Sequence, residues 1–129
     1  MADSAIRVVA AIIRNGDQYL VAKRPTGKAQ AGYWEFPGGK IEPQEAAEAA
    51  LARELVEELD AHAVEIGTFL AAGEHRYGDL VVRIEAYFAS CETTSLKCLE
   101  HEAIAWVSVE DLHTIELAPA DLFLLRWLK

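Results

Sequence analysis

Residues 44–59 constrain the fold of this chain more than any other segment. Their sequence, QEAAEAALARELVEEL, consists almost entirely of strong helix formers and contains neither glycine nor proline. Ala47, Leu51, Leu55 and Leu59 recur at every fourth position, which places one apolar stripe along a helix. The spacing therefore predicts an amphipathic helix over 44–59 whose stripe packs against the rest of the domain.

The same segment carries a cluster of carboxylates. Glu54, Glu57 and Glu58 stand at positions i, i+3 and i+4, so on a helix they project within an arc of roughly 100°. Like charges at this spacing repel one another, and two interpretations follow: a solvated acidic face, or a site for a hard cation. A bare pattern of this kind favours the solvated face.

The residues around the cluster favour the cation site. Gly38 and Gly39, just before the helix, permit backbone torsions that let carbonyl groups turn toward an ion. Arg53 can hold a neighbouring carboxylate, and Glu45 is a candidate partner. Mg²⁺ typically binds through a few carboxylates together with substrate phosphates. The segment therefore predicts a preorganised magnesium site.

The rest of the chain reads as short strands and turns. An Asn15-Gly16 turn between apolar runs at 6–13 and 19–22 predicts an antiparallel hairpin. Further strands are expected at 33–36, 63–71, 80–89 and 104–107, with 75–79 as a turn, and helices at 108–112 and from Pro119 through Leu128, where Leu122 and Trp127 are expected in the core. This order predicts an α+β fold with a central mixed β-sheet sandwiched between helices. A length of 129 residues fits a single domain spanning 1–129.

Over residues 39–61 the chain resembles the Nudix hydrolase box, G-x5-E-x7-R-E-U-x-E-E-x-G-U. Every charged position of that pattern matches, and the matching residues are Gly39, Glu45, Arg53, Glu54, Leu55, Glu57 and Glu58. The chain departs from the pattern at its end, where Asp60 replaces a glycine and Ala61 a larger aliphatic residue. Because aspartate enters the left-handed conformation less readily than glycine, this departure concerns the turn geometry and not the metal ligands.

The resemblance implies the Nudix fold and cleavage of a nucleoside diphosphate linked to another group, with Mg²⁺, or Mn²⁺ in its place, as cofactor. It implies that Glu54, Glu57 and Glu58 bind metal, that Gly39 offers a carbonyl, and that Arg53 and Glu45 orient the ligands. Water attack on a polyphosphate needs charge neutralisation and in-line positioning, which agrees with this set.

Motifs outside the box are similar to the MutT-like branch, and within it to the CTP pyrophosphohydrolase and 8-oxo-dGTP diphosphatase group. The family position implies that Glu100 reaches the metals or the attacking water; its alternative is an ordinary exposed glutamate. Either Glu54 or Glu100 is the general base. For the substrate, the resemblance implies that Phe36 packs against the base, whereas Arg24 and Lys40 contact the sugar, base or phosphate or are simply surface charges.

Asp121 occupies the position that reads the base in MutT-like enzymes, where asparagine accompanies oxidised guanine nucleotides. Asparagine offers a donor and an acceptor, whereas an ionised aspartate only accepts. The N4 amine of cytosine is a donor, so Asp121 favours cytosine nucleotides. A helix-dipole role for Asp121 at the start of the last helix is an equal alternative.

The resulting expectation is a Mg²⁺-dependent nucleoside triphosphate pyrophosphohydrolase that forms a monophosphate and pyrophosphate from CTP, dCTP or 5-substituted pyrimidine triphosphates. The alternatives are an 8-oxo-dGTP diphosphatase that sanitises the nucleotide pool and a noncatalytic nucleotide-binding module on the same scaffold.

Composition bounds the partners and the compartment. With 21 acidic against 12 basic residues, a net charge of -9 and a pI near 4.8, the chain is expected to bind neither nucleic acid nor membranes. Asp3 stands where a signal peptide carries positive charge, and the two cysteines form no C-x-x-C pair. We therefore expect a cytoplasmic protein, either a monomer or a homodimer.

Overall fold

A computed structural model describes residues 5–129; residues 1–4, with Asp3, lie outside the described part. The elements follow the chain in the order β1 (Ile6–Asn15), β2 (Gln18–Lys23), β3 (Trp34–Glu35), β4 (Gly38–Lys40), α1 (Ala47–Leu59), β5 (Glu65–Tyr77), β6 (Leu80–Ser90), β7 (Ala103–Ser108), α2 (Val109–Leu112) and the 3₁₀ helix η1 (Pro119–Trp127). Within the described residues, none of these helices combines the length and apolar character needed to cross a membrane.

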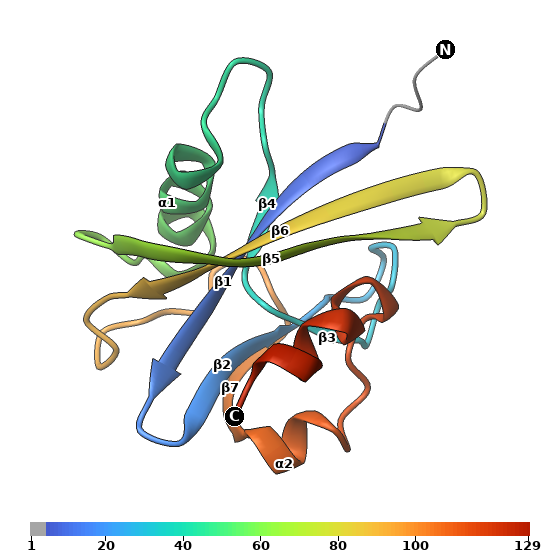
Figure 1. Cartoon of the computed structure of the whole chain (residues 1–129). Coiled ribbons are helices and arrows are strands. Elements are labelled where there is room, and N and C mark those ends of the chain that lie inside the picture. Colours follow the sequence, from blue (N-terminus) through green and yellow to red (C-terminus); the bar gives the residue numbers. More distant parts are fainter. Residues whose placement is uncertain (1–4) are drawn as a thin grey trace.

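The sheet is mixed, and β1 lies at its centre (Figure 1). β1 pairs in parallel with β6 from Ile6↔Val82 to Ile13↔Ala89, and antiparallel with β2 and β4. The strand order is β3-β2-β1-β6-β5, with β4 on β1 and β7 on β2. The predicted α+β fold with a mixed sheet is thus confirmed, and so is the hairpin around Asn15-Gly16.

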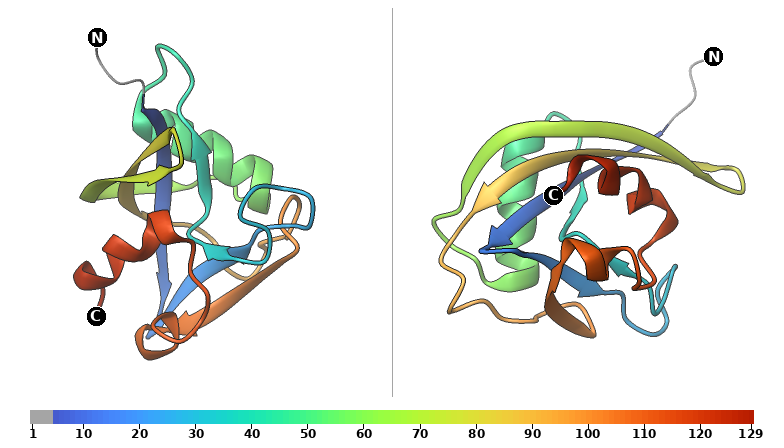
Figure 2. Two further views of the ribbon diagram at one scale, coloured as in Figure 1. Left: turned by 90° about the vertical axis from the view of Figure 1, so that its right-hand side faces the viewer. Right: turned by 60° about the horizontal axis from the view of Figure 1, so that its bottom comes forward.

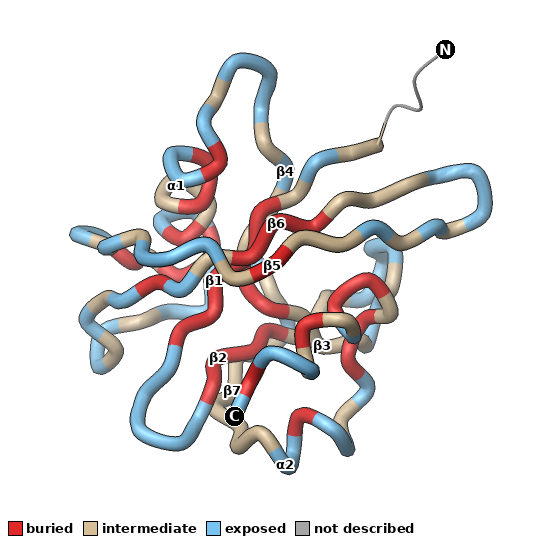
Figure 3. Tube along the Cα trace, viewed as in Figure 1, coloured by how far each residue is buried: buried red, intermediate tan, exposed pale blue. Residues whose placement is uncertain are grey.

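Alternation along β1 divides the interior into two hydrophobic cores. Val9, Ala11 and Ile13 face α1, whereas Ala10 and Ile12 face the side covered by η1 and α2. Figure 2 shows α1 on one side of the sheet and η1 beneath β5 and β6 on the other. Buried residues accordingly concentrate along β1, β2 and the inner face of α1 (Figure 3).

The predicted stripe of the central helix is buried as expected. Ala47 is 7% exposed, and Leu51, Leu55 and Leu59 are fully buried. The helix begins later than predicted, at Ala47 and not at residue 44, because Gln44 adopts a left-handed backbone with φ of 65°. Glu45 therefore lies in the loop before the helix, and its side chain forms an ion pair with Arg53 in the middle of the helix.

The helix ends in the left-handed conformation that the family pattern assigns to glycine. Asp60 has φ of 56° and ψ of 33°, and its N–H donates to the Val56 carbonyl at 3.0 Å. Its exposed carboxylate lies 2.8 Å from His62 Nε2 and 3.4 Å from Lys97 Nζ. Aspartate tolerates this conformation better than most residues, and the replacement of glycine leaves the helix cap intact.

Two other predicted elements differ from the structure. β5 continues to Tyr77, so the turn expected at 75–79 shrinks to Gly78 and Asp79 between two long paired strands. The last helix is a 3₁₀ helix, and its different period leaves Leu122 49% and Trp127 50% exposed, contrary to the prediction that both are core.

Candidate active site

A cavity of about 770 Å³ opens beside β3, β4 and the middle of α1. Eight of the predicted site residues line it: Arg24, Phe36, Gly39, Lys40, Glu54, Glu58, Glu100 and Asp121. The other three, Glu45, Arg53 and Glu57, lie outside its wall. Residues from five separate stretches of the chain thus meet at one cavity.

Two glycines bring β4 into close contact with its neighbours. A Cβ at Gly38, where φ is 154°, would overlap the carbonyl oxygen of Val9 on β1. A Cβ at Gly39 would overlap the carboxylate of Glu54 on α1. These two positions therefore let the backbone of β4 approach the helix as closely as the carboxylates require.

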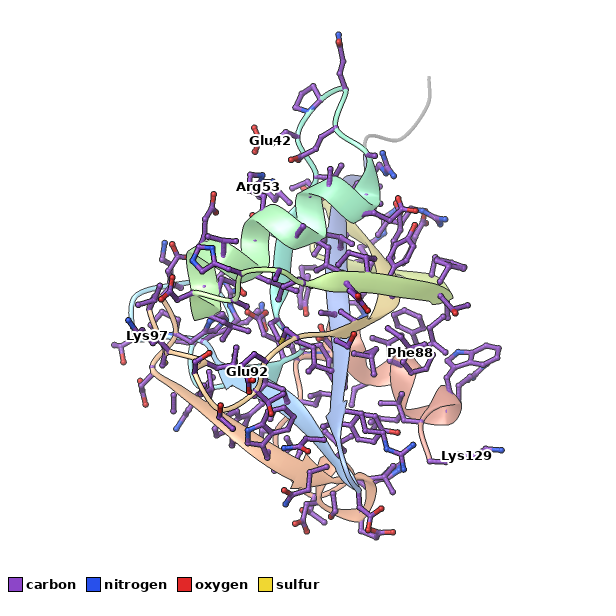
Figure 4. All side chains as sticks on the ribbon, turned by 90° about the vertical axis from the view of Figure 1, so that its left-hand side faces the viewer. Glu42, Arg53, Phe88, Glu92, Lys97 and Lys129 are labelled. Carbon is purple, nitrogen blue, oxygen red and sulfur yellow. The ribbon has the colours of Figure 1, made fainter. Side chains whose placement is uncertain are left out.

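Arg53 holds three carboxylates and the β4 backbone together. Its Nε and Nη2 donate to Glu45 at 2.9 and 3.0 Å in a bidentate pair, and Nη1 donates to Glu54 at 3.0 Å. Nη1 also lies 3.4 Å from Glu57, and Nη2 donates to the carbonyl of Lys40 at 3.0 Å. In Figure 4, Arg53 lies on α1 just below the loop that carries Glu42. The expected Arg53–Glu45 contact is present, and it lowers the pKa of Glu45 to about 2.

Glu58 is the most buried carboxylate of the cluster, at 7% exposure. The N–H of Gly38 donates to its Oε1 at 3.1 Å. Burial raises the pKa of Glu58 to about 9, and the nearby charges of Glu35, Glu54 and Glu100 add to the effect. Burial also raises the pKa of Glu54, against the opposing effect of Arg53. The cavity wall thus brings several carboxyl groups together, of which Glu54 is paired with Arg53.

This wall fits a hard divalent cation in chemistry. It offers the carboxylate oxygens of Glu54 and Glu58, ligands that Mg²⁺ prefers, and the Glu54 carboxylate occupies the space that a side chain at Gly39 would fill. Across residues 5–129, however, no three ligand side chains already converge closely enough to hold an ion. Glu57 is 47% exposed and contacts the group only through Arg53. The structure therefore brings Glu54, Glu58 and Glu100 to one cavity and leaves Glu57 at its margin.

Phe36 and Asp121 also line the cavity and contact each other. Phe36 is 3% exposed, and its N–H donates to Asp121 Oδ2 at 3.0 Å. Burial, with a smaller contribution from the charge of Glu35, raises the pKa of Asp121 to about 8. At neutral pH its carboxyl group is mainly protonated. In this protonated form the carboxyl group of Asp121 donates as well as accepts hydrogen bonds.

Arg24 and Lys40 lie on the cavity wall in different situations. Arg24 donates to the carboxylate of Glu35 at 3.2 and 3.3 Å and to the carbonyl of Ala29 at 2.6 Å. Lys40 is exposed. Arg24 is therefore held in place by the protein, whereas the ammonium group of Lys40 extends from the end of β4.

Sequence reasoning assigned no role to Glu35, Tyr77 and His101, which also line the cavity. His101 Nε2 lies 2.8 Å from Glu35 Oε2, and the hydroxyl of Tyr77 accepts from the N–H of Ala120 at 3.0 Å. In the sequence, Glu35 directly precedes Phe36 and His101 directly follows Glu100. Adjacency to predicted site residues is therefore the sequence feature that could have indicated Glu35 and His101. Tyr77 offered none, because it was placed in a turn.

Comparisons with known proteins match this chain to one family model, to related sequences and to solved structures. The family model described as "NUDIX domain" matches residues 8–127. The CTP pyrophosphohydrolase of Escherichia coli (strain K12) is 41% identical over 121 residues, which cover 94% of this chain and 89% of that protein. An 8-oxo-dGTP diphosphatase of Proteus vulgaris is 33% identical over 92 residues, covering 62% of this chain and 81% of that protein. The crystal structure of a MutT NUDIX hydrolase from Burkholderia pseudomallei superposes with a TM-score of 0.87 at 28% identity, covering 98% of this chain and 99% of that one.

Proposed function

This chain belongs to the Nudix hydrolase family, and from that membership we propose that it is a Mg²⁺-dependent pyrophosphohydrolase of CTP, dCTP or 5-substituted pyrimidine triphosphates. At the coarser level it is a Nudix nucleoside triphosphate pyrophosphohydrolase. The reaction consumes one water and releases a nucleoside monophosphate and pyrophosphate. Mn²⁺ is expected to substitute for Mg²⁺.

One observation carries the proposal. The same cavity is lined by the carboxylates of Glu54, Glu58 and Glu100 and by the buried pair of Phe36 and Asp121. The first suits the cation-bound phosphates of a nucleotide, and the second suits its planar base. A cavity of about 770 Å³ lies in the size range typical of small-molecule sites.

The chain's own residues have separate tasks in this reaction. Glu54, Glu57, Glu58, Glu100 and the Gly39 carbonyl would hold the cation, which would supply neutralisation of the phosphate charge. Either Glu54 or Glu100 accepts the proton of the attacking water.

Positioning falls to a second group. Arg53 and Glu45 hold Glu54 in place through the ion pairs at 3.0 and 2.9 Å. Lys40 extends toward the phosphates, whereas Arg24 contacts the nucleotide while bonded to Glu35.

Recognition of cytosine rests on Asp121. A neutral carboxyl donates through its O–H and accepts through its carbonyl oxygen, and the Watson–Crick edge of cytosine presents the N4 amine as donor beside an N3 acceptor. The carbonyl oxygen has two lone pairs, so it accepts from Phe36 N–H and from N4 together. Phe36 packs against the face of the base.

The test is a panel of nucleoside triphosphates with Mg²⁺ or Mn²⁺, scored for pyrophosphate release. We expect cytosine nucleotides and their 5-substituted forms to give the highest kcat/KM. Repeating the reaction in ¹⁸O-labelled water locates the phosphorus attacked. Glu57→Gln should abolish turnover with little change in Tm, and substantial activity of this variant with saturating metal would contradict its assignment. Nucleotide binding without pyrophosphate release would identify a noncatalytic module instead.

The protonation of Asp121 also favours a second candidate, hydrolysis of 8-oxo-dGTP. A neutral carboxyl resembles asparagine in offering both a donor and an acceptor, which suits an oxidised guanine edge as well. Asp121→Asn separates the two protonation states, because asparagine offers the same donor and acceptor as a neutral carboxyl. If neutral Asp121 reads the base, the ranking of substrates should stay unchanged in this variant; a shift of preference toward 8-oxo-dGTP would indicate that the ionised form reads cytosine.

A further inference from the structure

His101 is a buried side chain in an otherwise exposed and irregular segment. Residues 91–102 form no helix or strand between β6 and β7, and Glu100 within them is exposed. The His101 side chain is only 5% exposed and lines the cavity. Its position in the interior therefore needs an explanation that the segment's general exposure does not provide.

One ring nitrogen of His101 has a partner and the other has none. Nε2 lies 2.8 Å from Glu35 Oε2. Nδ1 is the single buried side-chain nitrogen or oxygen among the described residues without a hydrogen-bond partner. A buried polar atom without a hydrogen-bond partner destabilises the folded state, so stability alone does not account for a histidine here.

The two residues that flank Glu100 are each hydrogen-bonded to a different part of the fold. The N–H of Leu99 donates to the carbonyl of Glu58 at 3.0 Å, and His101 is bonded to Glu35 on β3. Glu100 therefore lies between a residue whose backbone is hydrogen-bonded to α1 and a residue whose side chain is hydrogen-bonded to β3. The side chain of Glu100 itself lines the cavity.

We propose that His101 is a positioning residue, which holds the Glu100 carboxylate at the catalytic cavity through its hydrogen bond to Glu35. Arg24 fixes the other end of that bond, because it donates to both oxygens of the Glu35 carboxylate. The hydrogen bonds from Arg24 to Glu35 and between Glu35 and His101 thus connect the loop after β2 to the segment before β7. We call this series of hydrogen bonds the support. This inference rests on the proposed function, in which Glu100 takes part in hydrolysis.

Two matched variants separate this role from a merely structural one. In His101→Gln the amide nitrogen occupies roughly the place of Nε2 and can still donate to Glu35. His101→Asn has the same functional group on a side chain one methylene shorter, which cannot reach that carboxylate. Misplacement of a catalytic group by about 1 Å costs on the order of 100-fold in rate.

We expect His101→Asn to lower kcat by about 10–100-fold with KM within about threefold of wild type, and His101→Gln to restore most of the loss. Tm should change little in either variant, and His113→Gln, at an exposed position, is the control that leaves kcat unchanged. Wild-type kcat in His101→Asn, or equal losses in both variants, would overturn the proposal. An effect confined to KM would also overturn it, because that result indicates direct substrate contact.

A second readout does not depend on turnover. In metal-free protein, the backbone amide NMR resonance of Glu100 should move in His101→Asn and stay near its wild-type position in His101→Gln. If the wild-type protein cleaves no nucleotide, the proposed function fails while this comparison still tests the support. If Glu100 shifts equally in both variants, the support fails even though the hydrolase activity stands.

Discussion

The buried carboxyl of Asp121 makes the stability of this protein depend on pH in a defined direction. Its pKa is about 8 in the folded protein, against an ordinary value of 3.8. Between these values the folded protein holds a proton that the unfolded chain has released. Because the folded state binds more protons there, the free energy of unfolding falls as pH rises from about 4 to about 8.

The size of the effect between pH 5.5 and 8.0 follows from the two pKa values. At about 1.36 kcal/mol per pH unit, deprotonation of the unfolded chain favours unfolding by about 3.4 kcal/mol over this interval. Partial deprotonation of the folded protein offsets about 0.4 kcal/mol, which leaves about 3 kcal/mol. Asp121→Asn removes the titrating group and should remove this part of the pH dependence.

The assay is urea unfolding of the metal-free protein at both pH values. Wild type should lose about 3 kcal/mol more than Asp121→Asn between pH 5.5 and 8.0. Any constant cost of the substitution cancels in this difference, and so does the titration of Glu58, which both proteins share. Asp17→Asn, at a fully exposed side chain, is the control and should parallel wild type. A pH dependence in Asp121→Asn that matches wild type within about 0.5 kcal/mol would refute the assignment of a protonated Asp121.

The remaining predictions concern the carboxylate wall, its support and the core. Gly39→Ala should lower kcat by about 100-fold while the protein stays folded by circular dichroism, because the added Cβ displaces the Glu54 carboxylate. Arg53→Lys should lower kcat at least about tenfold, since one ammonium group cannot replace the fork that spans Glu45 and Glu54; wild-type kinetics would contradict this. Leu55→Ala should lower the free energy of unfolding in urea by about 3–4 kcal/mol. A loss below about 1 kcal/mol would contradict this, because it would mean that neighbouring core side chains fill the space left by the deleted leucine side chain. Chelation of metal with EDTA should abolish pyrophosphate release and added Mg²⁺ restore it; activity that survives exhaustive chelation would contradict a metal-dependent reaction.

Features carried by local spacing were predictable from the sequence. The four-residue repeat of Ala47, Leu51, Leu55 and Leu59 predicted a stripe that is buried, and the offset of Arg53 from Glu45 predicted their ion pair. Gln44 shows the limit of such reasoning. A good helix former there adopts a left-handed backbone within a turn, in which the N–H of Glu45 donates to the carbonyl of Glu42 at 3.1 Å.

Features that depend on distant partners were not predictable. The length of β5 is set by its pairing with β6, and the exposure of Leu122 and Trp127 by the 3₁₀ period of η1. Glu35 and His101 are 66 positions apart and carry no shared motif, so only the fold shows their hydrogen bond.

The sequence by itself determined the family, the mixed α+β architecture and the candidate set of carboxylates, because helix periodicity and fixed offsets are local properties of the chain. Tertiary structure alone decided the state of those groups. It buried Glu58 and Asp121 so that burial raises their pKa values to about 9 and about 8, and it left Glu57 at the margin of the cavity. The physical reason is that burial and electrostatic environment depend on which distant segments pack together, and sequence spacing contains no such information.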